Sequence, residues 1–240
     1  MPKLKVKRFE QDPNCCAIAA CACVANYWDE NKDYEIAKKI TNRKVKRNFK
    51  KNNDGLYSGE ICLLLNAMGF NKVTIVSSDM DIFDYQWKNF KRKKMITILE
   101  ESLKHKKYVE EKKQTRSLLK WLKNMEYDNN LIIDYNFGRY IRHFIRQKRP
   151  IILSYNWTMY FKYCKTNEKG YEDVHNGGSE MHAVVAYGYD TKGVHICDSH
   201  NLLYRYRRKK YRNGFYKMSW ENLMTVMGEG DIYIADKYSI

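Results

Sequence analysis

The sequence predicts an α+β protein with an N-terminal helix and an antiparallel sheet built mostly from later segments. Residues 16–28 are apolar almost all round a helical repeat, which is typical of a buried helix. Residues 182–189 and 194–197 are apolar runs joined by the polar turn 190–193, which indicates a β-hairpin. A third apolar segment, residues 231–236, predicts another strand near the C-terminal end.

Length and composition favour one globular domain over residues 1–240. The 240 residues suffice to bury one core, and the content of 44% hydrophobic and 14% aromatic residues is that of a globular chain. The longest apolar runs, such as residues 16–25, fall well short of the roughly 20 residues that cross a bilayer. Residues 1–12 carry charge without an apolar segment behind them, so no secretory signal is expected.

Between residues 30 and 80 the sequence predicts a short helix, a longer helix and a strand, in that order. Ser58 is a good N-cap residue for the helical pattern that follows it, and Gly69 is a good C-terminal stop. The expected elements between residues 30 and 80 are a short amphipathic helix over 34–41, a basic loop over 43–53, a helix over 59–68 and a strand over 72–77.

Residues 80–129 differ from the rest of the chain in composition. They combine long helical patterns with many lysines and with two acidic blocks, at residues 100–101 and 110–111. This segment is therefore expected to be a helical, lysine-rich insertion or subdomain whose helices project from the core fold.

The elements expected in the second half alternate between helices and strands. Asn136 and Ser219 are suitable N-caps, and Pro150 separates a helix from a buried strand. The expected elements are a helix over 137–148, a strand over 151–156, a polar loop over 162–180, a basic strand near 203–207, a strand over 215–218 and a short helix over 220–227.

The formal net charge of +16 is concentrated in clusters. A field of this strength favours an acidic partner such as nucleic acid, an anionic membrane or an acidic protein. A solvated lysine-rich surface without a partner explains the same charge, and charge alone does not separate the two interpretations. The basic clusters lie at residues 3–8, 43–51, 88–94, 104–123 and 205–212.

The seven cysteines indicate a reducing, cytoplasmic compartment. Four of them crowd into residues 15–23, which is not the spacing of a disulfide framework, and the chain is longer than scaffolds that depend on disulfides. The spacing of these cysteines does not match the CxxC pairs of a zinc knuckle either, and the segment is predicted to be a buried helix. A zinc site is therefore not expected there. No metal and no cofactor are expected.

Four residues have the chemistry of acyl transfer by a thiol. Cys16 begins the predicted helix 16–28, where the helix dipole and free N–H groups favour a thiolate. His182 opens the predicted hairpin and Asp198 follows its second strand. A histidine can serve as the base, an aspartate can orient it, and the side chain of Gln11 can hold an oxyanion.

The sequence contexts of these residues resemble the bacteriocin-processing, or double-glycine leader, peptidases and their stand-alone relatives in the papain-like clan. The resemblance rests on Gln11 before the run Cys16-Ala17-Ile18-Ala19, and on the run HAVVAYGYD from His182 with Asp198 after it. Two further motifs of the family are matched by LNAMGF at residues 65–70 and by KRPIIL at residues 148–153.

The resemblance covers most of residues 9–79 and 130–200. It implies a papain-like fold, a protein or peptide substrate, and a site in which Cys16 is the nucleophile, His182 the base, Asp198 its orienter and Gln11 an oxyanion donor. Alanine at position 17 replaces the glycine usual in the family, and Gln11 lies one residue closer to the cysteine than is typical. Cys15 competes with Cys16 for the nucleophilic role, and Ala19 favours Cys16.

Three functions fit this sequence. The leading hypothesis is a cysteine peptidase that hydrolyses peptide bonds. The same four residues could instead transfer the acyl group to an amine or a thiol, as a transpeptidase or other acyltransferase does. A non-catalytic papain-like module that binds an acidic partner through its basic surface is the third.

Overall fold

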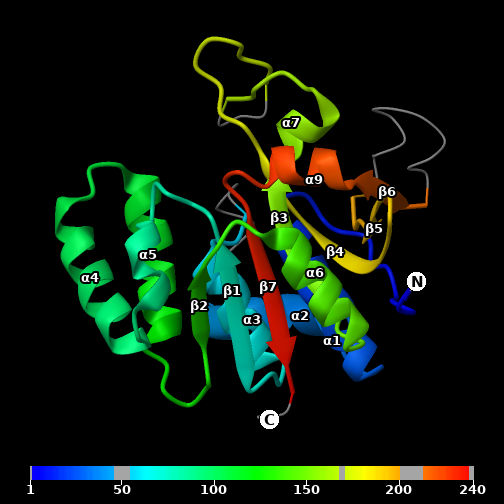
Figure 1. Cartoon of the computed structure of the whole chain (residues 1–240), viewed down its shortest axis with the longest axis horizontal. Helices are drawn as coiled ribbons and strands as arrows, with labels where there is room; N and C mark the ends of the chain where they lie inside the picture. Colours follow the sequence, from blue (N-terminus) through cyan, green and yellow to red (C-terminus); the bar gives the residue numbers. More distant parts are fainter. Residues whose placement is uncertain (1, 46–54, 168–170, 201–212, 238–240) are drawn as a thin grey trace.

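The computed structural model describes residues 2–45, 55–167, 171–200 and 213–237. Its strands form one seven-stranded sheet in the order β2-β1-β7-β3-β4-β5-β6 (Figure 1). All neighbouring strands pair antiparallel except β1 and β2, which are parallel. The strands are β1 Lys72–Ser77, β2 Asn130–Ile133, β3 Ile151–Asn156, β4 Met181–Asp190, β5 Gly193–Cys197, β6 Phe215–Ser219 and β7 Asp231–Asp236.

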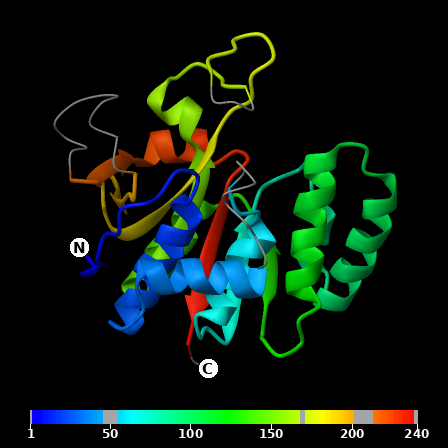
Figure 2. The same cartoon turned by 180° about the vertical axis from the view of Figure 1, so that it is seen from behind.

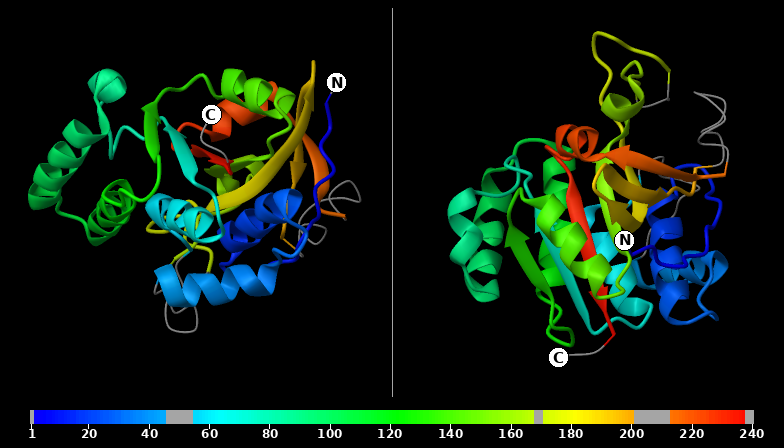
Figure 3. Two further views of the ribbon diagram at one scale, coloured as in Figure 1. Left: turned by 90° about the horizontal axis from the view of Figure 1, so that it is seen from below. Right: turned by 45° about the vertical axis from the view of Figure 1, so that its right-hand side comes forward.

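Helices cover both faces of the sheet. In Figure 2, α1, α2 and α3, coloured blue to cyan, lie in front of it, and Figure 3 shows α6 and α9 on the opposite face. The helices are α1 Cys16–Trp28, α2 Tyr34–Ile40, α3 Ser58–Ala67, α4 Arg92–His105, α5 Val109–Leu122, α6 Phe137–Arg146, α7 Trp157–Phe161 and α9 Trp220–Val226, with a π-helix over Thr41–Val45 and a 3-10 helix over Tyr85–Asn89. The α+β prediction is confirmed.

Each face of the sheet has its own hydrophobic core. The first core joins α1, whose residues from Ala17 to Asn26 are all buried, to α3 and to one face of the strands. The second packs α6 and α9 on the other face around Tyr155 and Ile196. Because successive side chains of a strand alternate between faces, β4 contributes Ala183 and Val185 to the first core and Val184 to the second.

The helix caps mostly follow the prediction. Asn136 accepts a hydrogen bond from the backbone N–H of Arg139 at 3.3 Å, and Ser219 accepts one from Asn222 at 3.2 Å. Gly69 has φ 103° just after α3, a conformation in which glycine is strongly favoured. The N-cap assigned to Ser58 was wrong: Tyr57 precedes α3, and the buried Ser58 hydroxyl donates to Asp231 at 2.5 Å.

Several element predictions need correction. Strand β2 and helix α7 were not predicted, and α6 ends at Arg146 rather than at residue 148. The start of the predicted basic loop is part of the π-helix Thr41–Val45. The rest of that loop from residue 46, the predicted strand near 203–207 and the basic cluster at 205–212 lie outside the described residues.

Residues 80–129 contain helices α4 and α5, which lie beside β2 at one end of the sheet (Figure 1). Helix α5 has a buried face that packs against the rest of the protein. Its Trp121 and Leu118 are fully buried in the same core as α1. Helix α5 also crosses α3 closely: a Cβ added to Gly59 would lie 2.2 Å from the carbonyl oxygen of Ser117. The insertion is thus tied to the core through α5.

Among the described residues, no helix is both long enough and apolar enough to cross a bilayer.

Candidate active site

The candidate nucleophile lies at the N-terminus of α1. Cys16 is the first helical residue, and its neighbour Cys15, at the N-cap, makes no side-chain capping bond. The first N–H groups of a helix have no partner within the helix, so this end stabilises negative charge. The backbone N–H groups of Ala17 and Ala183 both act on the Cys16 sulfur. The local backbone therefore favours a thiolate at this position.

His182 lies near the start of β4, opposite Tyr155 of β3 in the ladder. It is 5% exposed, and aromatic side chains surround its ring. The ring centroids of Tyr155, Trp157 and His200 lie 6.1, 6.0 and 5.9 Å from that of His182. This packing limits rotation of the imidazole.

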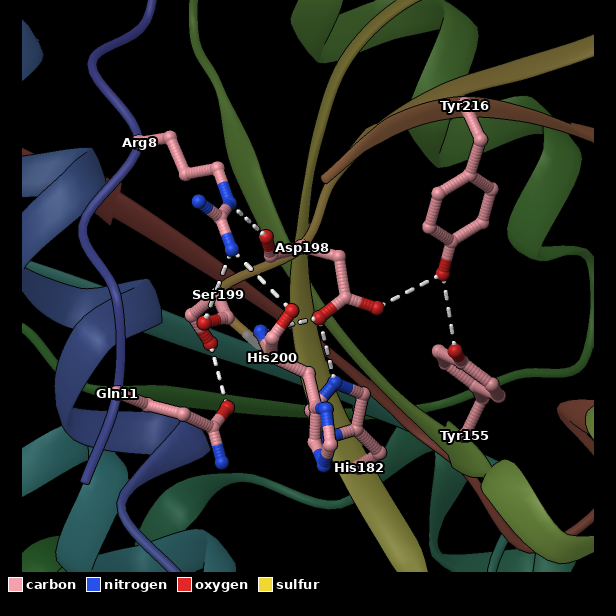
Figure 4. Close-up of polar contacts among 8 residues, drawn as sticks. All are labelled: Arg8, Gln11, Tyr155, His182, Asp198, Ser199, His200 and Tyr216. Atoms are coloured by element: carbon pink, nitrogen blue, oxygen red, sulfur yellow. Dashed lines mark hydrogen bonds and ion pairs between the residues drawn. The ribbon is translucent and has the colours of Figure 1, made fainter. Parts of the chain in front are cut away.

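Asp198 follows β5 directly and is fully buried. Its Oδ1 accepts hydrogen bonds from His182 Nε2 and from the backbone N–H of His200, both at 2.8 Å (Figure 4). Its Oδ2 accepts a hydrogen bond from the Tyr216 hydroxyl at 3.0 Å, and Tyr216 contacts Tyr155 at 3.1 Å. Three donors therefore fix both oxygens of a buried carboxylate. Since Nε2 of His182 is occupied, its Nδ1 remains for the thiol.

The electrostatics of the site favour an ion pair between thiol and imidazole. Burial acts to raise the pKa of Cys16, but the hydrogen bond with His182 and the charge of His182 outweigh it, so this pKa is lowered. Burial acts to lower the pKa of His182, but the charge and hydrogen bond of Asp198, with help from Cys16, raise it to about 10. The two groups are thus charged together at pH values between the lowered pKa of Cys16 and the raised pKa of His182.

Cys15 has a different environment from Cys16. Burial raises the pKa of the Cys15 thiol, against a smaller opposite effect of its hydrogen bond with Tyr34. Cys15 is 4% exposed and belongs to the first core, whereas Cys16 is partly exposed. Of the two adjacent thiols, only Cys16 has the histidine beside it.

Gln11 lies in the segment before α1 and is held by Ser199. Its backbone N–H donates to the Ser199 carbonyl at 3.1 Å, and its side-chain Oε1 accepts a hydrogen bond from the Ser199 hydroxyl at 2.7 Å (Figure 4). Because the hydroxyl engages the amide oxygen, the amide NH₂ is the end left to donate to another group. Within the described part of the chain it has no hydrogen-bond partner.

Two residues of this arrangement were not predicted from the sequence. Tyr216 lies 18 positions from Asp198, and Ser199 lies 188 positions from Gln11. Neither tyrosine in a strand nor serine in a loop is unusual, so only the register of β6 against β5 could have indicated Tyr216. The predicted absence of a metal is not tested; in the described ranges, no three or more His, Cys, Asp or Glu side chains gather in a metal-binding arrangement.

Comparison with known proteins places the chain in a family. No curated protein matches the sequence. Similar solved structures include one described as a C39-like peptidase from Bacillus anthracis, with 15% identity and a TM-score of 0.46 over 100% of both chains. Another is xylellain, a cysteine protease from Xylella fastidiosa, with 11% identity and a TM-score of 0.48 over 100% of this chain and 87% of that one. The family profile matches residues 3–227, so the chain belongs to the Peptidase_C39 like family.

Proposed function

We propose that this protein is a cysteine peptidase that hydrolyses peptide bonds through Cys16, His182 and Asp198, with Gln11 as an oxyanion donor. The observation that carries the proposal is the buried hydrogen bond of 2.8 Å between His182 Nε2 and Asp198 Oδ1. The same histidine, through its charge and its hydrogen bond, lowers the pKa of the Cys16 thiol at the N-terminus of α1. Membership in a peptidase family supports a peptide substrate.

The first half of the reaction acylates the enzyme. The Cys16 thiolate attacks the carbonyl carbon of the scissile bond, and the electron pair moves to the carbonyl oxygen. The amide NH₂ of Gln11 and the backbone N–H of Cys16 stabilise this oxyanion. When the intermediate collapses, the C–N bond breaks, and His182 gives the proton on Nδ1 to the leaving amine.

The second half releases the acid. Neutral His182 takes a proton from water, and the resulting hydroxide attacks the thioester carbonyl. Collapse of the second tetrahedral intermediate frees the Cys16 thiolate beside the reprotonated imidazole. Asp198 keeps Nε2–H pointed at its own carboxylate throughout, so Nδ1 stays aimed at the reacting atoms.

Cleavage of a peptide mixture tests the proposal. The wild-type protein is incubated with peptides prepared from a whole proteome, and newly formed termini are identified by mass spectrometry. New termini should depend on Cys16 and disappear in Cys16→Ser. The matched control is Cys164→Ser, which removes an exposed thiol elsewhere and should cleave normally. Equal sets of termini from wild type and Cys16→Ser would contradict the proposal.

The Gln11 role has a separate test. Gln11→Ala should lower turnover about 100- to 1000-fold, the usual effect of losing one oxyanion donor. Alkylation of Cys16 by iodoacetamide forms no oxyanion, so its rate should change little. A parallel fall of both rates would mean that Gln11 supports the site only structurally.

Addition of glycinamide to the digest distinguishes acyl transfer, which would give amidated products, from hydrolysis.

The proposal also includes an acidic partner or substrate. Exposed basic side chains on α4, on α5 and in the loop between them include four without an ion pair to another described residue: Lys93, Lys107, Arg116 and Lys120. Together with the net charge of +16, they provide a field that would attract an acidic chain. We also propose a reducing, cytoplasmic location, because a thiolate nucleophile is readily oxidised.

A further inference from the structure

The backbone that carries Asp198 is not held by the sheet. The last ladder pairs of β5 join Cys197 to Phe215 on one side and to Val185 on the other. Beyond them, Asp198 keeps one backbone bond, from its N–H to the carbonyl of Gly214 at 2.8 Å. A carboxylate that orients an imidazole must be placed to within a fraction of an ångström, so other contacts have to fix residues 198–200.

Arg8 supplies these contacts. Its Nε donates to the carbonyl oxygen of Asp198 at 2.6 Å, and its Nη2 donates to those of Ser199 at 3.4 Å and His200 at 3.2 Å (Figure 4). One planar guanidinium therefore binds three successive carbonyls. Its remaining nitrogen, Nη1, pairs with Glu10 at 3.2 Å, and the Arg8 side chain is 16% exposed. A lysine ammonium has three donors on one nitrogen, so it cannot reproduce the planar fork in which Nε and Nη2 reach different carbonyls.

The segment that carries Arg8 also carries Gln11. It is anchored to the sheet at its start, where Lys3 bridges Gly188 and the Leu4 N–H donates to the Tyr187 carbonyl at 2.7 Å. At its other end, the Gln11 N–H donates to the same Ser199 carbonyl that accepts from Arg8. Arg8 thus links the candidate oxyanion donor to the backbone of the candidate triad acid.

Gly214 leaves the space that the Arg8 guanidinium occupies. A Cβ added to Gly214 would lie 2.1 Å from Arg8 Nε and 2.4 Å from the carbonyl oxygen of Asp198. The φ of Gly214 is 69°, in the left-handed region that favours glycine. A side chain at this position would push Arg8 away from the Asp198 carbonyl.

We propose that Arg8 is a positioning residue that binds the carbonyls of Asp198, Ser199 and His200 and so holds the Asp198 carboxylate in line with His182 while fixing Ser199 for Gln11. The inference rests on the proposed function of the site and adds a residue to it. Arg8 touches no reacting atom, and it acts on the thiol only through Asp198 and His182.

Reactivity of the Cys16 thiol tests this role without a known substrate. The rate of iodoacetamide alkylation is measured between pH 5 and pH 10 in wild type, Arg8→Ala and Arg8→Lys, with fragment-ion spectra assigning the label to Cys16 or Cys15. The matched control is Lys5→Ala, which removes one exposed positive charge from the same segment. Thermal unfolding is recorded for each variant.

Arg8→Ala should alkylate Cys16 up to about 100-fold more slowly near neutral pH, because misplacement of about 1 Å has effects of this size. Its profile should move toward the alkaline range of an ordinary thiol. Arg8→Lys should restore only part of the rate, and millimolar methylguanidinium should restore much of it in Arg8→Ala. Lys5→Ala should behave as wild type. If Arg8→Ala does not fold, Arg8→Lys carries the comparison.

Two outcomes would overturn the inference. Arg8 variants with lower unfolding temperatures but the wild-type rate and pH profile would show that Arg8 only stabilises the fold. A loss that Lys5→Ala shares would show that net charge is responsible. Failure of the proposed function is distinguishable, because wild-type Cys16 would then alkylate no faster near neutral pH than a simple thiol, whatever the state of Arg8.

Discussion

The thiol of Cys16 and the imidazole of His182 shift each other's ionisation in opposite directions. The histidine lowers the pKa of the thiol, and Asp198 with the thiol raises the pKa of His182 to about 10. The thiolate is present above the pKa of Cys16, and the imidazolium is present below that of His182. The reactive ion pair therefore occupies the interval between the two.

We expect the pH dependence of turnover to be bell-shaped, with an acid limb from Cys16 and an alkaline limb from His182. In His182→Ala, burial of Cys16 is no longer opposed by the imidazole, so the thiol pKa rises. The Cys16 alkylation rate near neutral pH should fall roughly tenfold per pKa unit gained. Stopped-flow alkylation across the pH range measures both effects. An unchanged profile in His182→Ala would contradict the ion pair.

Tyr216 is expected to fix the second oxygen of the Asp198 carboxylate. Tyr216→Phe removes the donor to Oδ2 while keeping the aromatic ring in the second core. One hydrogen bond to a buried charge corresponds to about 1.5–3 kcal/mol, so turnover should fall about tenfold or more. Tyr155→Phe is the control, because it removes a neighbouring hydroxyl bonded to Tyr216 rather than to Asp198. An equal or larger loss in Tyr155→Phe would refute the assigned role.

The sequence allowed Cys16, His182 and Asp198 to be predicted because each stands at the boundary of a recognisable element. A cysteine opening an apolar helix and a histidine opening an apolar hairpin are local patterns. Arg8 could not be singled out, since its three carbonyl partners lie 190 to 192 positions away and it is one of several basic residues in the stretch 3–8. Contacts between side chain and backbone over such separations leave no periodic pattern.

At the scale of elements, the contact between α3 and α5 depends on the absence of a side chain at Gly59. A Cβ there would lie 2.2 Å from the Ser117 carbonyl and 2.5 Å from the Leu118 nitrogen, both backbone atoms that cannot rotate away. The same contact is joined by Gln114, whose Nε2 donates to the Ser58 hydroxyl at 2.8 Å. The insertion is therefore attached by backbone packing as well as by buried side chains.

Gly59→Ala should lower the free energy of unfolding by about 1–3 kcal/mol, the usual cost of overpacking, although alanine favours a helix. Urea unfolding followed by circular dichroism measures the change. Gly178→Ala is the matched control, because a Cβ there meets nothing within 4 Å, and its stability should stay near that of wild type. A neutral or stabilising Gly59→Ala would mean that the two helices are not held in this contact.

The elements that could be predicted are those with a long periodic pattern or a clear cap. Helix α1 is apolar all round, β4 and β5 flank a polar turn, and Asn136 caps α6. Strand β2 has only four residues, and α7 only five, too few to establish a period. The structure of β2 depends on pairing with β1, and that of α7 on packing against α9 and β4, which are tertiary effects.

At the scale of the whole molecule, the sheet separates two cores, and the candidate site includes groups from both sides. Cys16 belongs to the helix layer of the first core, while Tyr155 and Tyr216 belong to the second. Residues near both ends of the chain thus meet around β4 and β5. Mutations in either core are expected to alter the site through the distance between its two halves.

The net charge of +16 fits both a solvated surface and a binding surface, and an experiment is needed to distinguish the two. The decisive variant reverses four exposed basic residues of α4, of α5 and of the loop between them to glutamate: Lys93, Lys107, Arg116 and Lys120. The control reverses four exposed lysines elsewhere and so gives the same net charge: Lys5, Lys39, Lys44 and Lys192.

If α4 and α5 recruit an acidic substrate, KM for acidic peptides from the proteome digest should rise in the first variant and much less in the control. Because exposed charges act over a Debye length of about 10 Å at 0.1 M salt, wild-type KM should also rise with salt between about 0.05 and 0.5 M. The value of kcat should remain unchanged, since these four side chains contact neither Cys16 nor His182. Equal KM values in both variants and at all salt concentrations would assign the charge to solvation alone.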